Sequence, residues 1–315
     1  ENARYKDWFC DVNFWGNNEY NDGFSYGNWG GFNLLVKLNQ RNPEVQNYHY
    51  DTIRFWVDEF DIDGIRLDAA DVLDFDFMRG LRRLANEVKP EFWLMGEVIH
   101  GDYSRWANPE MLHSVTNYEL HKGLWSGHND HNYFEIAHTM RRLQGLCHDT
   151  RLYLFSDNHD VERIASILRD PSHLPVAYGL LFAMPGVPAV YYGSEWGILG
   201  RKADGDDALR PALDHPESNR LTTWISRLAQ ARRNSPALRH GSYRNVHLTN
   251  RQIIFERAVP GERVLVAINA DSAPYTAHFD AGSGLAEDLI TGATHDFGGG
   301  SLLPPYSVSY WRTER

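Results

Sequence analysis

Residues 61–70 read Asp-Ile-Asp-Gly-Ile-Arg-Leu-Asp-Ala-Ala, and this stretch decides the fold expected for the whole chain. Its isoleucines and leucine predict a short buried strand. Side chains alternate along a strand, so Arg66 and Asp68 should point to the same side. A guanidinium beside a carboxylate favours the ionised carboxylate and fixes its orientation. Such a pair is typical either of a structural ion pair or of a catalytic acid that is held in place.

Two later stretches repeat the pattern of an apolar strand that ends in an acid. Residues 92–98 lead to Glu97, and residues 152–160 lead to Asp160. Parallel strands that each deliver a polar group at the carboxyl end build the active site of a β/α barrel. We therefore expect the carboxyl groups of Asp68, Glu97 and Asp160 to meet in one pocket.

The same stretches carry a family resemblance. Asp-Gly-Ile-Arg-Leu-Asp-Ala-Ala at 63–70, Gly-Glu-Val-Ile-His at 96–100 and Phe-Ser-Asp-Asn-His-Asp at 155–160 resemble, in order, three signature regions of glycoside hydrolase family 13, the α-amylase family. Leu-Val-Lys-Leu-Asn at 35–39 resembles a fourth signature, from its cyclomaltodextrinase and neopullulanase branch. The resemblance implies a (β/α)8 barrel enzyme that cleaves α-1,4 or α-1,6 glucosidic bonds in malto-oligosaccharides, cyclodextrins or starch-type glucans.

The resemblance also implies the roles of the three acids. Asp68 matches the nucleophile, Glu97 the acid/base, and Asp160 the third acid, which orients sugar hydroxyls. A retaining glycosidase needs its two reacting carboxyl groups about 5–5.5 Å apart. The apolar neighbours of Glu97 would favour its protonated form, which a general acid requires.

Four further residues are candidates for binding the sugar. By resemblance, Arg66 and His159 donate hydrogen bonds to sugar hydroxyls, and His100 lines the leaving-group side. Arg210 lies in an acidic-Arg-Pro stretch that resembles a contact to outer sugars. For the two histidines the alternative is a hydrogen-bonded residue at the barrel rim.

Other polar clusters favour structural roles. Asp157 and Asn158 should shape the turn that precedes His159. His128, Asp130 and His131 could suggest a metal, but no third set of spaced ligands accompanies them. Helix capping or solvent exposure is the expected role of this cluster.

The residues after the nucleophile predict that no calcium binds there. Many α-amylases have Ala-Ala-Lys-His at this point, and the resemblance gives that Lys-His pair a part in binding outer sugars and a structural calcium. Here the sequence reads Ala-Ala-Asp-Val at 69–72. We therefore expect no cofactor and no calcium held by this segment, while a different calcium site, within residues 11–22, stays open.

Composition excludes several partner classes. The net charge of −11 argues against a nucleic-acid partner. The uncharged run 174–192 contains three prolines, so it favours a helix up to Met184 and a buried strand from Ala189 over a membrane span. Two cysteines, Cys10 and Cys147, do not make a disulfide scaffold, and with the neopullulanase-like signature they favour the cytoplasm over secretion.

The chain is expected to contain three regions. Residues 1–34 lack periodicity and read, by resemblance, as the tail of a small inserted domain. Residues 35–238 alternate strands with helices, which favours a parallel β/α barrel, with helices expected from Asn42 to Phe60 and near 75–88, 130–145, 161–168, 174–184 and 219–234. Residues 239–315 predict an antiparallel β-sandwich of short strands.

The barrel is expected to be incomplete within this chain. We count five candidate strands, ending near Asp68, Glu97, Tyr118, Asp157 and Glu195, whereas a closed barrel needs eight. The family's first signature, Asp-x-x-x-Asn-His, does not occur. We expect the first three strand–helix units to be absent, and the missing N-terminal part or a homo-oligomer to complete the catalyst.

Two other functions remain open. A transglycosylase or isomerase would use the same glycosyl-enzyme intermediate, with a sugar in place of water as the attacking group. A non-catalytic amylase-like binding or structural subunit would be expected to lose acids, and here Asp68, Glu97 and Asp160 are all present.

Overall fold

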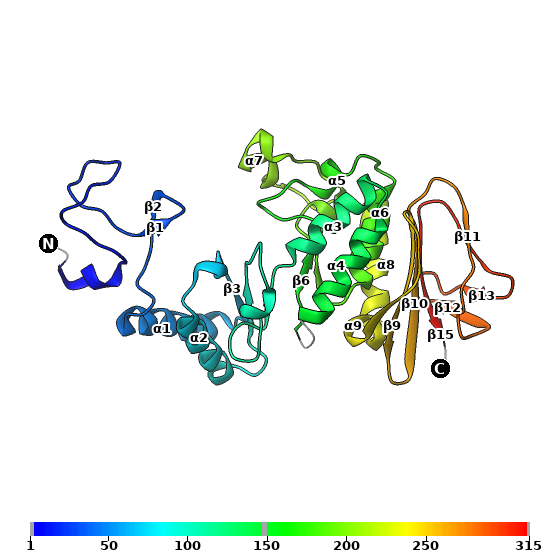
Figure 1. Cartoon of the computed structure of the whole chain (residues 1–315), viewed down its shortest axis with the longest axis horizontal. Coiled ribbons are helices and arrows are strands. Elements are labelled where there is room, and N and C mark those ends of the chain that lie inside the picture. Colours follow the sequence, from blue (N-terminus) through cyan, green and yellow to red (C-terminus); the bar gives the residue numbers. More distant parts are fainter. Residues whose placement is uncertain (1–2, 147–149, 314–315) are drawn as a thin grey trace. The chain divides into compact units, whose positions relative to one another are not determined.

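The computed structural model describes residues 3–146 and 150–313, which divide into two units (Figure 1). Unit 1 holds the described residues of 1–98 and 104–115. Unit 2 holds those of 99–103 and 116–315. The domain boundaries expected at residues 34 and 238 stay a prediction.

Unit 1 contains a parallel sheet with the order β3-β4-β5. Its strands are β3 (Gly64–Leu67), β4 (Trp93–Gly96) and β5 (Ser114–Val115). Helix α2 (Phe75–Val88) connects β3 to β4, as predicted, and it buries one apolar face. Parallel neighbours require such a crossover, so the chain between the first two acids forms a β/α unit.

Helices α1 and α2 of unit 1 each begin at an N-cap residue of a type that can be recognised in the sequence. The side chain of Asn42 accepts a hydrogen bond from the Glu44 amide at the start of α1 (Pro43–Phe60). Asp74 accepts from the amides of Asp76 and Phe77 at the start of α2. Each cap satisfies amides that the first helical turn leaves without partners, which fixes where the helix begins.

Residues 3–42 contain little regular structure, as expected from their lack of periodicity. They form a 3-10 turn (Ala3–Trp8) and the short antiparallel pair β1 (Asn28–Trp29) and β2 (Phe32–Val36). Aromatic side chains remain exposed here, and Trp15 is 98% exposed.

Unit 2 begins with helices around a second pair of parallel strands. Strand β6 (Tyr153–Phe155) pairs with β7 (Val187–Ala189). The helices are α3 (Tyr118–Asn129), α4 (Tyr133–Leu146), α5 (Ile164–Ile167), α6 (His173–Ala183), α7 (Asp206–Leu209), α8 (Arg220–Asn234) and α9 (Pro236–His240). Together with unit 1, the described residues contain five parallel strands.

Two sequence expectations in this region were wrong. Strand β7 ends at Ala189 and does not run from Ala189 to Glu195, because its partner β6 offers only three residues and the chain turns at Gly193, which has a φ of 81°. Helix α3 lies in a segment where no helix was expected. Its apolar residues are interrupted by glycines and histidines, but tertiary packing buries most of it against α4.

The C-terminal part of unit 2 is antiparallel, as predicted. Its larger sheet has the order β13-β12-β15-β10-β9-β8, and β11 pairs with β14. These strands are β8 (Ser242–Leu248), β9 (Gln252–Val259), β10 (Glu262–Asn269), β11 (Tyr275–Ala277), β12 (Leu285–Asp288), β13 (Thr294–Asp296), β14 (Ser301–Leu303) and β15 (Ser307–Thr313). Strands β12, β13 and β14 were not predicted, since each is too short to show a period-two pattern of apolar residues.

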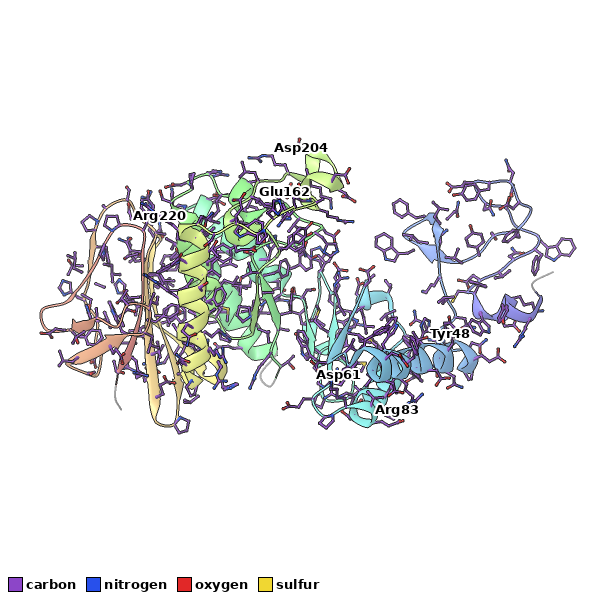
Figure 2. All side chains as sticks on the ribbon, turned by 180° about the vertical axis from the view of Figure 1, so that it is seen from behind. Tyr48, Asp61, Arg83, Glu162, Asp204 and Arg220 are labelled. Atoms are coloured by element: carbon purple, nitrogen blue, oxygen red, sulfur yellow. The ribbon has the colours of Figure 1, made fainter. Side chains whose placement is uncertain are left out.

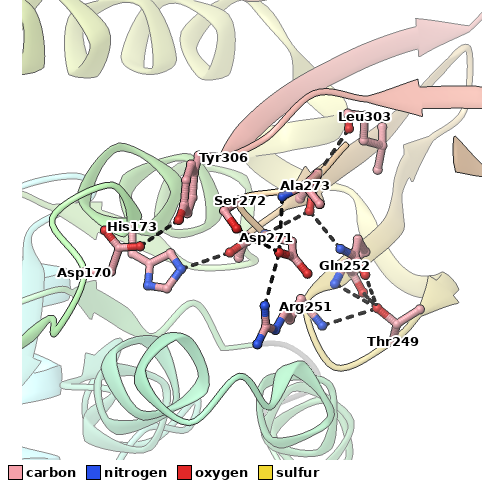
Figure 3. A network of polar contacts seen from close by, with 12 residues as sticks. Asp170, His173, Thr249, Arg251, Gln252, Asp271, Ser272, Ala273, Leu303 and Tyr306 are labelled. Carbon is pink, nitrogen blue, oxygen red and sulfur yellow. Dashed lines mark hydrogen bonds and ion pairs between the residues drawn. The ribbon is translucent and has the colours of Figure 1, made fainter. Parts of the chain in front are cut away.

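A polar network joins this sheet to the helices of unit 2 (Figure 3). The Tyr306 hydroxyl donates to Asp170 at 2.8 Å, and His173 Nε2 lies 3.0 Å from the Ala270 carbonyl oxygen. Helix α6 also approaches β15 closely, because a Cβ at Gly179 would lie 2.6 Å from Val308. The antiparallel sheet and the helical part of unit 2 are therefore one packed body.

Among the described residues, none of the helices combines the length and apolar character needed to cross a membrane. The uncharged run forms α6 up to Ala183, with Met184 as its C-cap, as predicted. Cys10 is a free thiol, and Cys147 lies outside the described residues.

Candidate active site

Arg66 links two of the predicted acids within unit 1. Its Nη1 lies 2.8 Å from Asp68 Oδ1, and its Nη2 lies 2.9 Å from Glu97 Oε2. Strands β3 and β4 are parallel neighbours with Leu67 opposite Gly96, so the residues that follow each strand end side by side. One guanidinium therefore holds both carboxylates at the carboxyl edge of this sheet.

The two carboxylates differ in exposure. The Asp68 side chain is 80% exposed, whereas the Glu97 side chain is 11% exposed. Glu97 Oε2 also accepts a hydrogen bond from the Ala69 amide at 3.3 Å. Ala69 has a φ of 43°, a left-handed conformation that turns the chain sharply after the strand. The Glu97 side chain is thus held in a buried position, while the Asp68 side chain is exposed to solvent.

Asp68 and Arg66 line a cavity of about 980 Å³ within unit 1. Apolar side chains form most of its remaining wall, among them Ile53 and Trp56 of α1. Trp29, from β1, lies on its lining as well. A large apolar cavity with a few convergent polar groups is a common form of ligand site.

In unit 2, four contacts hold the predicted third acid. Asp160 Oδ1 lies 2.9 Å from Arg210 Nη2, and Oδ2 lies 3.0 Å from His159 Nε2. Its amide donates to Asn158 Oδ1 at 2.8 Å, and its carbonyl accepts from Lys202 at 3.0 Å. The Asp160 carboxylate is therefore oriented through both of its oxygens.

Arg210 has a position that the sequence did not suggest. Its Nη2 contacts Asp160, and its Nε donates to the His159 carbonyl at 3.0 Å. A further contact of 3.6 Å reaches Asp206. In this structure Arg210 thus contacts the third acid and its neighbour, while a contact to outer sugars stays a prediction.

Beneath this group lies a buried pair of charged residues. Asp157 Oδ2 accepts from the Ile164 amide at 2.8 Å and from Ser194 Oγ at 2.7 Å, which supports the structural role expected of it. Burial raises the pKa of the Asp157 carboxyl. Arg163 is fully buried and donates to the carbonyls of Tyr192 and Leu209.

The sequence did not indicate a role for Arg163 near Asp160. Its guanidinium lies 4.1 Å from the centre of the Tyr191 ring, and Nη1 also contacts Ser194 Oγ at 3.0 Å. No local pattern separates this arginine from a surface one, because its partners lie about 30 to 45 residues further along the chain. Its hydrogen bonds connect the chain just after Asp160 with Tyr192, Ser194 and Leu209.

The remaining predicted site residue, His100, is exposed in the short segment 99–103 that belongs to unit 2. A role for His100 in substrate binding stays a prediction. The meeting of Asp68, Glu97 and Asp160 in one pocket also stays a prediction.

The cluster near residue 130 has a structural explanation. His128 is buried, with Nδ1 2.6 Å from the Leu124 carbonyl and Nε2 2.9 Å from the Tyr133 hydroxyl. Both ring nitrogens are therefore occupied, and the ring is neither a cap nor exposed, which corrects the expectation. Asp130 agrees with the expectation, because it is the C-cap of α3 and forms an exposed ion pair with Arg169 at 3.2 Å.

Burial of His128 should make unit 2 less stable at acidic pH. Burial lowers the pKa of His128 to about 4, so the unfolded chain binds this proton more readily than the folded chain as the pH falls from about 6.5 to 4. The neutral ring therefore contributes stability that is present above pH 6.5 and lost below it. Between pH 7 and pH 5 the expected loss is about 2 kcal/mol from this residue.

Urea unfolding of the wild type and of His128→Gln at pH 7 and pH 5 tests this prediction. The variant should show a smaller loss of unfolding free energy on acidification. His215→Gln, an exchange at an exposed histidine, is the matched control and should keep the wild-type loss. An equal pH dependence in all three proteins would contradict the prediction.

Comparisons with known proteins agree with these motifs. A family model described as the α-amylase catalytic domain matches residues 2–234. The chain is 28% identical over 249 residues to a cyclomaltodextrinase of Thermoanaerobacter pseudethanolicus, covering 76% of this chain and 42% of that protein. It is 31% identical over 290 residues to neopullulanase 2 of Thermoactinomyces vulgaris, covering 85% and 47%. The chain thus spans about half the length of the curated relatives it matches.

A solved structure shows the same fold. The α-amylase of Geobacillus thermoleovorans, complexed with acarbose, aligns with a TM-score of 0.83 and 22% identity, covering 99% of this chain and 73% of that one. The likeness supports an α-amylase catalytic-domain fold followed by a C-terminal antiparallel sheet, which confirms the expected fold class at that level.

Proposed function

The chain belongs to the α-amylase family, and on this basis we propose that the protein is a retaining glycoside hydrolase of α-glucans. Its substrates are malto-oligosaccharides, cyclodextrins or starch-type glucans, cleaved at α-1,4 bonds, with α-1,6 bonds as the second class. The observation that carries the proposal is the single guanidinium of Arg66 in contact with both Asp68 and Glu97.

The proposed reaction has two steps. In the first, Glu97 gives its proton to the glycosidic oxygen, the C1–O bond breaks, and the Asp68 carboxylate forms a bond to C1. In the second, Glu97, now ionised, takes a proton from water, whose oxygen displaces Asp68 from C1. The contacts with Arg66 support these roles, because one guanidinium orients both carboxyl groups at the same edge of the sheet.

Asp160 is proposed to bind sugar hydroxyls near the reacting carbon. Support comes from the rigid setting of its carboxylate between Arg210 and His159. A carboxylate that is already oriented loses little entropy when the substrate binds, so its hydrogen bonds can strengthen in the transition state.

The barrel that carries this chemistry is proposed to include strands beyond those described here. Five parallel strands occur among the described residues, and a closed barrel needs eight. The activity is therefore proposed for the protein with its barrel completed.

Product analysis with maltotriose tests the proposed function. A hydrolase releases glucose and maltose with the α configuration of the cleaved bond retained. Longer or rearranged sugars as the main products would show a transglycosylase or isomerase, which shares the first step. A completed barrel with no turnover of maltotriose, cyclodextrin or starch would contradict the enzyme assignment and favour a binding subunit.

Arg210 is proposed to act through Asp160, and its exchange separates two roles. Arg210→Gln removes the contact to the Asp160 carboxylate, so kcat should fall about 10- to 100-fold while KM changes little. The control Arg220→Gln, at the exposed first residue of α8 (Figure 2), should leave both constants unchanged. A raised KM with unchanged kcat would instead assign Arg210 to outer sugars, as the sequence suggested.

A further inference from the structure

Unit 2 contains a second cavity, of about 480 Å³, at the opposite end of β6 from Asp160. Leu152 and Gly186, which precede β6 and β7, lie on its lining, whereas Asp160 follows the carboxyl end of β6. Helix α9 and strand β9, which lie beside each other in Figure 1, supply another part of its wall. The cavity is therefore separate from the group around Asp160.

Two buried arginines, one in the lining and one behind it, have no acid as a hydrogen-bond partner among the described residues. Arg257 is 1% exposed, lines the cavity, and donates to the carbonyls of Ser242 and Gly241 at 3.1 and 2.9 Å. Arg232 is 7% exposed and donates to the Gly186 carbonyl, which belongs to the lining. Both charges are held by backbone carbonyls, so their positive potential is not cancelled by a carboxylate.

Two arginines and a histidine stand at the mouth of this cavity. Arg151, Arg239 and His240 line it and are exposed, and none of their side chains has a hydrogen bond or ion pair among the described residues. Burial lowers the pKa of His240, and the nearby charges of Arg151 and Arg239 lower it further, so the positive charge at the mouth comes from the two arginines.

The charge of this cavity contrasts with that of the protein. The chain carries a net charge of −11, yet no carboxylate among the described residues lines the cavity. A concave, partly apolar surface that carries charges of one sign concentrates the electrostatic field and attracts ions of the opposite charge. Arginine forks match the oxygens of a phosphate group in geometry as well as in charge.

The rest of the lining suits a sugar. Gln144 Oε1 and Asn117 Nδ2 have no partner among the described residues, because the other end of each amide makes the hydrogen bond that holds it. Leu143 and Leu152 supply apolar surface for the C–H faces of a ring. The volume falls within the usual range for small-molecule sites and leaves room beyond a phosphate group.

We propose that this cavity binds a phosphorylated monosaccharide, with Arg151 and Arg239 contacting the phosphate and Gln144 and Asn117 contacting the sugar hydroxyls. This site is distinct from the proposed catalytic group and does not depend on the proposed activity. Its occupation would stabilise unit 2, because a ligand that binds only the folded state adds to the free energy of unfolding.

Calorimetric titration of the full chain with glucose 6-phosphate, inorganic phosphate and glucose, at constant ionic strength, tests the proposal. Glucose 6-phosphate should bind at least 10-fold more tightly than either of the others. The double variant Arg151→Gln/Arg239→Gln should weaken its binding at least 10-fold. Arg227→Gln/Arg233→Gln, which removes two exposed arginines of α8 outside the cavity, is the matched control and should bind as the wild type does.

Three results would overturn the site. Inorganic phosphate binding as tightly as glucose 6-phosphate would exclude the sugar part. Unchanged binding in the Arg151/Arg239 variant would place the ligand elsewhere. An equal loss in the Arg227/Arg233 control would show non-specific attraction to positive charge. Circular dichroism of each variant checks the fold, and Gln144→Leu gives an independent second exchange that should weaken only the phosphorylated sugar.

Discussion

Glu97→Gln should lower kcat on unactivated glucans by at least about 10³-fold while the fold stays intact. The amide cannot donate the proton that the leaving oxygen needs. Its carbonyl oxygen can still accept from the Ala69 amide and from Arg66, so the wall around residue 97 should keep its shape. Steady-state kinetics on maltotriose, with thermal unfolding as the check on folding, measures the effect.

The substrate can be chosen so that the result identifies the acid. With a leaving group that departs without protonation, such as fluoride in a maltosyl fluoride, the first step of Glu97→Gln should recover most of its rate. Asp68→Asn removes the nucleophile, so it should lose activity on both substrates alike. Glu87→Gln, an equivalent exchange on the exposed side of α2, should keep wild-type rates. Near wild-type turnover of maltotriose by Glu97→Gln would exclude Glu97 as the acid.

Arg163→Met should destabilise unit 2 by about 3–5 kcal/mol, the usual loss when one partner of a buried charged group is removed. Burial raises the pKa of the Asp157 carboxyl, and the charge of the fully buried Arg163 opposes this shift. Its removal takes this charge away from Asp157 and leaves the carbonyls of Tyr192 and Leu209 without this donor. Urea unfolding monitored by tryptophan fluorescence gives the free energy directly.

A matched substitution shows whether the stability loss comes from the buried position of Arg163 or from the loss of any arginine. Arg169→Met removes an exposed arginine whose ion pair with Asp130 is worth less than about 1 kcal/mol. Arg163→Lys should fall between the two, because an ammonium keeps the charge but cannot span the carbonyls that the planar guanidinium contacts. A loss below 1 kcal/mol in Arg163→Met would contradict the supporting role given to this residue.

Local chemistry explains what could be predicted of the fold. Helices α1, α2 and α8 were expected close to where they occur, because capping residues and helical spacing act within one or two turns of the chain. Helix α3 and strands β12, β13 and β14 were not expected. Their residues carry little periodicity, and these segments become ordered through contacts with distant elements.

The same division applies to the candidate site. That Arg66 and Asp68 share a side follows from the alternation of a single strand, and the structure shows the pair at 2.8 Å. The family also followed from the motifs, whose order along the chain is a property of the sequence. The sequence likewise marked Glu97 and Asp160 as acids that end apolar strands.

Only the tertiary structure decided which partners these acids have. The contact of Arg66 with Glu97 depends on the register of β3 against β4, which no residue near either one encodes. The contact of Arg210 with Asp160 joins residues 50 positions apart, and Arg163 reaches carbonyls 29 and 46 positions away. The gathering of four arginines around the second cavity likewise combines residues of β9, α8, α9 and the chain before β6. Each of these contacts forms because packing of the whole unit brings distant segments together, and the spacing of side chains along one segment carries no information about that packing.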